Sequence, residues 1–113
     1  MFVTRAKLEM YQCLWDVSAF RALPIEDIRS SGYVVDTLES VLYCLLTTNS
    51  YEECVLKAVN LGEDTDTVGA IVGGIAGLAY GYDAIPQKWR DALLKKEWIL
   101  EMCKSFAERL DKV

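Results

Sequence analysis

The sequence predicts a single all-α domain over residues 1–113, with about five to six helices. Two patterns indicate this class: apolar residues recur at steps of three and four, and no segment alternates between apolar and polar positions as a half-buried strand would. Length is the third observation. About half of the 113 residues are hydrophobic, which suffices for one core but not for two ordinary domains. We therefore expect one compact helical domain.

The first helix is predicted over residues 3–20, where apolar positions are spaced three or four residues apart, namely Val3, Ala6, Met10, Leu14 and Val17. Pro24 ends this segment, and Ser30-Ser31-Gly32 predicts a loop. A second helix follows over residues 34–46, with Asp36 and Glu39 on its polar side.

The third helix is predicted from Ser50 through Val59, because Ser50 followed by Glu53 fits a capping box and Gly62 follows the end. The fourth spans residues 67–80. Its glycines recur every four residues and give one face that another backbone can approach closely, at positions 69, 73, 77 and 81. Two further helices are predicted over residues 86–94, opened by proline, and over the amphipathic residues 97–111.

Composition excludes several function classes. The net charge is -5, with 5 basic and 11 acidic side chains in residues 1–82 and 7 basic and 6 acidic in residues 83–113, so no basic stripe exists for nucleic acid. The longest apolar run, residues 68–80, is too short to cross a membrane, and the N-terminus does not resemble a secretory signal. We expect no nucleic-acid and no membrane partner.

Histidine is absent, which removes Ser-His-Asp and Cys-His catalysis and every histidine metal site. The four cysteines form no Cys-x-x-Cys pair, so neither a zinc knuckle nor a redox motif is indicated. Without a secretory signal, buried free thiols in a cytoplasmic protein are the expected state. Chemistry in this chain must rely on carboxylates, hydroxyls and backbone groups.

The acidic loop at residues 60–69 concentrates such groups just before the glycine-rich helix. Asp64, Asp66 and Thr67 can converge on one divalent cation if the loop curls, and oxygen-only ligands favour magnesium, manganese or calcium over zinc. A structural interpretation competes with this one. Aspartate and threonine are ordinary helix caps, and carboxylates are stabilised near a helix N-terminus. Spacing alone favours the cap.

Two other motif matches fail. The Asp64-x-Asp66-x-x-Gly69 pattern opens like an EF-hand loop, but its twelfth position is Ile75 where a bidentate glutamate is required. Asp-x-Asp-x-Val also resembles the first motif of haloacid-dehalogenase-type phosphatases. Those proteins continue into a large α/β domain, whereas only 47 helical-looking residues follow here.

Three blocks of the chain resemble the C-terminal part of the ADP-ribosylglycohydrolase family, which includes the dinitrogenase reductase-activating glycohydrolases. The blocks are residues 32–39 (GYVVDTLE), residues 58–67 (AVNLGEDTDT) with the glycine-rich helix, and residues 84–86 (AIP) with Trp89. The resemblance covers about residues 30–110. It implies an all-α hydrolase that holds two magnesium or manganese ions and cleaves the glycosidic bond between ADP-ribose and an acceptor.

By this resemblance, Asp64, Asp66 and Thr67 are metal ligands, and Asp66 bridges the two ions. Tyr33 lies where the family presents an aromatic ring to the nucleotide, although a packed loop tyrosine fits the position nearly as well. Asp36 is interpreted as a cap or loop brace. No catalytic acid or base is identified in this chain, because the family's N-terminal part supplies that residue.

The chain departs from the family in length. Family enzymes have around 300 residues, and their N-terminal part supplies a Thr/Ser-Asp-Asp cluster that completes the metal site; residues 1–30 contain only Glu26-Asp27, in a different context. We expect a truncated form: a fragment or split enzyme, a remnant, or a stable binding or assembly domain. Uncovered helix faces predict a homo-oligomer, or a partner chain that supplies the missing half.

Two function hypotheses follow. The first is a hydrolase of ADP-ribosyl linkages, active when a partner completes the metal site. The second is a catalytically inactive relative that binds ADP-ribose or serves a structural, oligomerising role.

Overall fold

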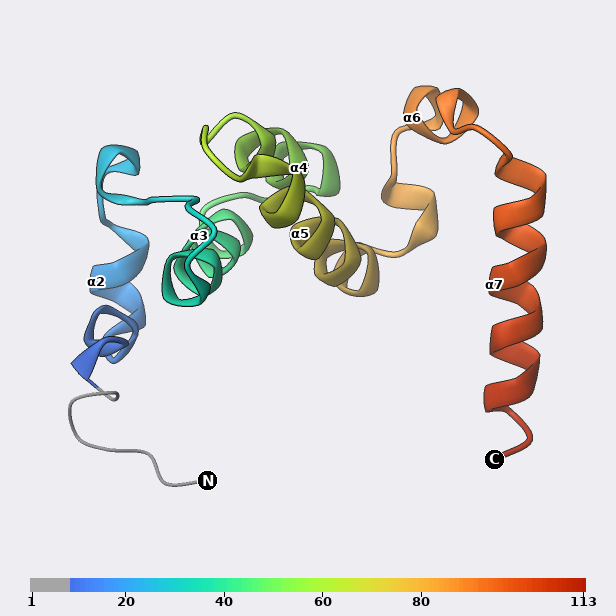
Figure 1. Ribbon diagram of the computed structural model, residues 1–113, viewed down its shortest axis with the longest axis horizontal. Helices are drawn as coiled ribbons and strands as arrows, with labels where there is room; N and C mark the ends of the chain where they lie inside the picture. The colour runs from blue at the N-terminus through green and yellow to red at the C-terminus, as the bar shows by residue number, and fades with distance from the viewer. Residues whose placement is uncertain (1–8) are drawn as a thin grey trace.

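The computed structural model describes residues 9–113, and all regular structure in this range is helical (Figure 1). The α-helices are α2 (Val17–Arg21), α3 (Val34–Leu46), α4 (Tyr51–Val59), α5 (Thr65–Tyr80), α6 (Gln87–Ala92) and α7 (Lys96–Leu110). Three short 3-10 helices lie between them, η1 (Gln12–Leu14), η2 (Ile25–Asp27) and η3 (Tyr82–Ala84). No strand occurs in residues 9–113, so the all-α prediction is confirmed.

The first predicted helix is not continuous. Residues 3–8 lie outside the described residues, and in the described part the chain leaves helical geometry at Asp16 (φ −119°, ψ 99°) between η1 and α2. The Asp16 carboxylate accepts a hydrogen bond from the Ala19 amide at 3.1 Å and so caps α2. The capping preference of aspartate therefore outweighs the apolar period across this position.

The remaining helix boundaries all lie within two residues of the predicted ones. Helix α3 has the predicted bounds. Half of the predicted capping box forms: Ser50 Oγ accepts from the Glu53 amide at 3.1 Å, whereas Glu53 Oε2 accepts from the amide of Asn49, the residue before the cap, at 3.1 Å. Helix α5 begins at Thr65, two residues early, because Asp64 is its N-cap. Pro86 precedes α6 as N-cap and does not form its first turn.

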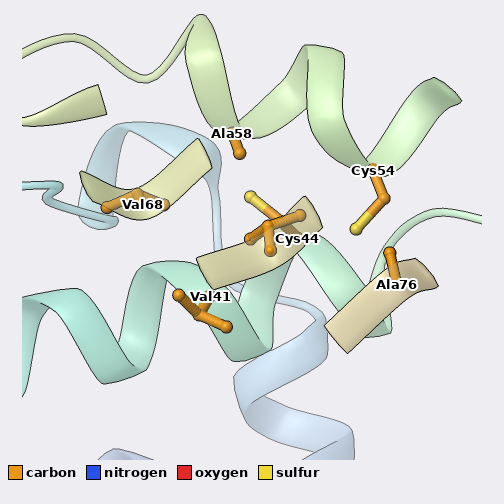
Figure 2. Packing of buried hydrophobic residues seen from close by; sticks show 7 residues of the cluster. Val41, Cys44, Cys54, Ala58, Val68 and Ala76 are labelled. Carbon is orange, nitrogen blue, oxygen red and sulfur yellow. The ribbon is translucent and has the colours of Figure 1, made fainter. Parts of the chain in front are cut away.

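Helices α3, α4 and α5 enclose the main core (Figures 1 and 2). In Figure 2 the side chains of Cys44 from α3, Cys54 from α4 and Ala76 from α5 gather between the three helices. These core residues are small or medium in size and almost fully buried, namely Val41, Cys44, Cys54, Ala58, Val68, Val72 and Ala76. Small side chains bring the helices close together, and dispersion contacts accumulate at short range.

The glycine face of α5 receives α4, as the four-residue spacing predicts. A Cβ atom on Gly69 would lie 3.0 Å from Val59 Cγ1, and one on Gly73 would lie 3.4 Å from the Tyr51 hydroxyl. Both neighbours belong to α4. Gly81, with φ +88°, then ends α5 in a conformation that other residues rarely adopt.

A second cluster attaches the N-terminal segment to α3. Phe20 from α2 meets the ring of Tyr43 edge-on, with centroids 6.0 Å apart and an interplanar angle of 85°. The Tyr43 hydroxyl donates to the Leu23 carbonyl at 2.8 Å, and Ile28 is buried beside them. This cluster fixes the path of residues 20–30 toward the acidic loop.

Helices α6 and α7 extend away from the core at the opposite end from α2 (Figure 1). Trp89 of α6 approaches Tyr51 of α4 with ring centroids 6.3 Å apart, whereas α7 has no buried residue. Lys95 links the two helices in a left-handed conformation (φ 55°). The radius of gyration is 16.5 Å, against about 13 Å for a compact domain of this length.

The four cysteines are free, as predicted, but the expectation that all are buried is wrong. Cys44 and Cys54 are buried in the core, whereas Cys13 and Cys103 are exposed. Burial raises the pKa of Cys44 to about 11. The pKa of Cys13 is also raised to about 11, by desolvation and then by its hydrogen bond to Glu39 Oε1 at 3.0 Å.

None of the described helices is both long and apolar enough to cross a membrane.

Candidate metal centre

Two loops meet at the N-terminus of α5 and hold it in place. The Asp64 amide donates to the Ser30 carbonyl at 2.9 Å, and the Ser30 hydroxyl donates back to the Gly62 carbonyl. Arg29 and Glu63 add an exposed ion pair at 3.4 Å. Ser30 is buried, so its two hydrogen bonds are shielded from water and contribute more than the exposed ion pair does.

The backbone of this loop is unusual at two successive residues. Gly62 (φ 89°) and Glu63 (φ 57°) both adopt positive φ, which reverses the chain between α4 and α5. For a residue with a side chain this conformation costs about 1–2 kcal/mol. Ser30 forms hydrogen bonds with Gly62 before Glu63 and with Asp64 after it. These bonds offset that cost and fix the position of Asp64.

The three predicted ligands lie together at the first turn of α5. The Thr67 hydroxyl donates to Asp64 Oδ1 at 3.0 Å, and the Thr67 amide donates to Asp66 Oδ1 at 3.0 Å. The pKa of Asp66 is lowered, first by a hydrogen bond with the Asp64 carboxyl group and then by the Thr67 amide. Thr67 thus joins the two carboxyl groups, since its hydroxyl donates to Asp64 and its amide donates to Asp66.

Asp64 does not behave as an ordinary helix cap. It occupies the N-cap position of α5 with φ −87° and ψ 55°, yet its side chain makes no capping hydrogen bond to the helix. By contrast, Asp16 and Ser50 accept such bonds at α2 and α4. The Asp64 carboxylate is directed instead to the Thr67 hydroxyl and to Asp66. A capping role alone therefore does not explain this side chain.

The donor set suits a hard divalent cation but fills only part of its coordination. Two carboxylates and one hydroxyl are oxygen donors of the kind magnesium and manganese prefer, and magnesium takes six ligands. Asp66 and Thr67 are exposed, which leaves room for other ligands. In residues 9–113, no group of three or more His, Cys, Asp or Glu side chains is placed to hold a metal ion.

Tyr33 and Asp36 lie at the start of α3, shortly after Gly32, and Gly32 is the residue of this segment that approaches the centre. Tyr33 is the N-cap residue of α3; its ring is half exposed, and its hydroxyl approaches Met10 Sδ at 3.7 Å. A Cβ atom on the preceding Gly32 would lie 3.6 Å from Asp64 Oδ2. Asp36 accepts a hydrogen bond from the Ser31 hydroxyl, so it braces the loop, in agreement with the sequence-based interpretation.

The residues that position the acidic loop are not identified by sequence reasoning. The sequence indicates only a generic loop at Ser30 and no role for Arg29 or Glu63, yet all three join residues 29–30 to residues 62–64. Their partners are more than 30 residues distant along the chain. No local sequence pattern predicts such a contact. The one structural reason for it is that Ile28, next to Arg29, is buried in the second cluster.

The fold and this centre define an all-α domain with a cluster of oxygen donors at the N-terminus of a glycine-rich helix. The family profile described as ADP-ribosylglycohydrolase matches residues 3–113. The chain belongs to the ADP-ribosylglycohydrolase family.

Three curated relatives illustrate the similarity. The ADP-ribosylarginine hydrolase Tri1 of Serratia proteamaculans (strain 568) is 47% identical over 74 residues, which cover 66% of this chain and 20% of the relative. The ADP-ribosyl-[dinitrogen reductase] glycohydrolase of Rhodospirillum rubrum is 43% identical over 65 residues, covering 58% and 22%. The human ADP-ribosylhydrolase ARH3 is 25% identical over 92 residues, covering 72% and 25%. The chain thus matches about a fifth to a quarter of each relative's length.

Proposed function

We propose that this chain supplies one side of a magnesium or manganese site in a hydrolase of ADP-ribosyl linkages. The carrying observation is the Asp64 side chain, which occupies a helix N-cap without capping and turns toward Thr67 and Asp66. Family membership supports the reaction class, because the relatives named above are hydrolases of ADP-ribose conjugates.

The residues of the loop have distinct roles in this proposal. A bound divalent cation would supply Lewis-acid chemistry toward substrate hydroxyl groups and water. Asp64 and Asp66 would hold such cations through their carboxylate oxygens. The Thr67 hydroxyl, a third ligand, also fixes the orientation of the Asp64 carboxylate through their 3.0 Å hydrogen bond. Tyr33, half exposed at the start of α3, offers its ring to the nucleotide.

The proposed substrate is an ADP-ribosylated arginine. Tri1 of Serratia proteamaculans, a hydrolase of ADP-ribosylarginine by name, is 47% identical to this chain over the matched residues. The bond to be cleaved then joins the anomeric carbon of the ribose to a guanidinium nitrogen. The net negative charge of the chain disfavours nucleic acid as a competing partner.

Other polypeptide must complete the site, because Asp64, Asp66 and Thr67 provide too few donors for two cations. The further ligands and the catalytic acid or base come from polypeptide outside residues 9–113. A catalytically inactive module is the second candidate function. In residues 9–113 no three His, Cys, Asp or Glu side chains are placed to hold a metal ion, which favours the inactive module for the chain alone.

Manganese-induced broadening of amide resonances tests the metal assignment. A half-site with three donors is expected to bind weakly, with a dissociation constant in roughly the millimolar range. We expect sub-stoichiometric Mn²⁺ to broaden the amide signals of residues 63–68 first, and Asp66→Asn to abolish that selectivity. Asp83→Asn is the matched control, because Asp83 is an exposed aspartate in η3, away from the loop. Equal broadening in wild type and Asp66→Asn would contradict the proposal.

Hydrolysis by the purified chain tests whether copies of this chain complete the site by themselves. Release of ADP-ribose from ADP-ribosyl-arginine, dependent on Mg²⁺ and lost in Asp66→Asn, identifies an enzyme. Metal-dependent ADP-ribose binding without release is expected both of the inactive module and of a half-site that lacks its other polypeptide.

A further inference from the structure

We infer that Gly32 keeps the Oδ2 side of Asp64 open, so that a hard divalent cation and the groups that complete its coordination can reach this carboxylate. This role rests on the proposed metal function and deepens it, because Gly32 then sets how much space the centre has on one side. The contacts that carry it lie wholly within residues 9–113 and do not depend on which polypeptide completes the site.

The backbone does not require a glycine at position 32. Gly62 and Gly81 have φ values of 89° and 88°, in the left-handed region that other residues rarely adopt, whereas φ of Gly32 lies outside this region. Close packing between helices does not require it either. Among the described residues other than its chain neighbours, Asp64 Oδ2 is the one atom within 4 Å of where a Cβ atom of residue 32 would lie. The space beside Asp64 is therefore what a side chain at position 32 would change.

The two oxygens of the Asp64 carboxylate have different surroundings. Oδ1 accepts the hydrogen bond from the Thr67 hydroxyl at 3.0 Å, and Oδ2 lies on the side of Gly32. Asp64 is partly buried whereas Gly32 is exposed, so the Gly32 side of the carboxylate is its more open side. Magnesium holds six ligands at about 2.0–2.1 Å, so a cation on Oδ2 needs room for itself and for its other ligands. The bare backbone of Gly32 leaves that room.

Hydrogen bonds hold the segment around Gly32 against the acidic loop. The Ser30 carbonyl, two residues before Gly32, accepts from the Asp64 amide at 2.9 Å. On the other side, the Tyr33 amide donates to the Ser31 hydroxyl at 3.2 Å, and Tyr33 is the N-cap residue of α3. The backbone at position 32 is thus fixed at both ends. A larger side chain there would stay beside Oδ2, because the segment cannot turn it away without breaking these bonds.

The size of the side chain at position 32 decides how much of this space is lost. The methyl group of Gly32→Ala would lie 3.6 Å from Oδ2, an ordinary contact distance, and would leave most of the space open. Valine carries two γ carbons, each about 1.5 Å beyond Cβ, which fill the space around that point. Gly32→Leu is a second bulky variant. Gly74→Val is the matched control, because Gly74 is exposed on α5 and a Cβ atom there would meet nothing within 4 Å.

Carbodiimide-driven coupling of glycine ethyl ester to carboxyl groups measures access to Asp64 without any metal. Tandem mass spectrometry of the labelled peptide separates Asp64 from Asp66, which is exposed and serves as the internal reference. Gly32→Val and Gly32→Leu are expected to lower the Asp64-to-Asp66 labelling ratio about threefold or more, because the added carbons block the reagent. Gly32→Ala and Gly74→Val are expected to keep the wild-type ratio. Circular dichroism and urea unfolding confirm that each variant keeps its fold.

Manganese broadening of residues 63–68 then tests the link to the metal. Gly32→Val is expected to raise the Mn²⁺ concentration for half-maximal broadening about tenfold, an effect typical of changes beside a metal ligand, and Gly32→Ala to leave it unchanged. Equal labelling of Asp64 in wild type and both bulky variants overturns the role of Gly32, as does selective broadening that both variants retain at wild-type Mn²⁺ concentrations. Absence of selective broadening in the wild type contradicts the metal proposal itself, and the role of Gly32 falls with it, so the two failures give different results.

Discussion

The Thr67 hydroxyl donates to the Asp64 carboxylate at 3.0 Å across the first turn of α5, although Asp64 holds the N-cap position of that helix. A capping aspartate turns its oxygen to the amides of the first turn. Here the carboxylate turns to a hydroxyl and to the neighbouring Asp66, so the two acids stay together at the surface. This arrangement is the basis of the metal proposal.

Ser30 positions the loop without being a ligand. In Ser30→Ala the Gly62 carbonyl loses its donor, and we expect the free energy of unfolding to fall by about 1–3 kcal/mol. Manganese broadening at residues 63–68 should also weaken. Denaturant unfolding and the broadening experiment check both effects, with the exposed Ser105→Ala as control. Unchanged stability and unchanged broadening would show that Ser30 does not hold the loop.

The core of α5 is expected to be sensitive to truncation. Val72 is fully buried between the three central helices, so Val72→Ala should lower the free energy of unfolding by about 2 kcal/mol. Val17→Ala removes the same atoms from a 55% exposed position and should cost far less. Urea denaturation of the two variants measures the difference. Equal losses would mean that the core does not lie where α3, α4 and α5 meet.

The glycines of α5 should respond differently to alanine. A methyl group on Gly74 would have no neighbouring atom within 4 Å, so Gly74→Ala should raise the free energy of unfolding by about 0.5–1 kcal/mol through helix propensity. At Gly69 a methyl group would lie only 3.0 Å from Val59 Cγ1. Because this contact is too close, Gly69→Ala should leave the free energy of unfolding unchanged or lower it. Thermal unfolding compares the pair. A larger stabilisation by Gly69→Ala would refute the close contact between α4 and α5.

Cys13 should react slowly despite its exposure. Its pKa is raised to about 11, by desolvation and then by Glu39, so at pH 8 only about one thiol in a thousand is ionised. Alkylation should therefore accelerate about tenfold per pH unit between pH 8 and pH 10. Glu39→Gln removes the neighbouring charge and should accelerate alkylation at pH 8. Mass spectrometry of labelled peptides measures the rates, and the buried Cys44 and Cys54 serve as unreactive references.

The local parts of the structure could be predicted from the sequence. The bounds of α3, the Ser50 cap and the glycine face of α5 follow from spacing and capping preferences. The break in the first helix at Asp16 could not be predicted. The apolar periodicity continues across this position and favours one helix, but Asp16 instead caps a new one. The exposure of Cys13 and Cys103 also escapes prediction, because residue type alone does not show that few neighbours cover them.

For the candidate site, the sequence and the family resemblance together point to Asp64, Asp66 and Thr67, which lie within four successive residues. The contacts that orient them could not be predicted. Ser30 and Arg29 reach the loop from more than 30 residues away, and such pairing depends on how Ile28, Phe20 and Tyr43 pack rather than on any local pattern.

Calorimetric titration of ADP-ribose into this chain, with and without Mg²⁺, tests the central claim most directly. We predict heat of binding that requires Mg²⁺, that disappears in Asp66→Asn and that survives in Asp83→Asn. Binding of the same affinity with and without Mg²⁺, or equal binding by wild type and Asp66→Asn, would contradict it.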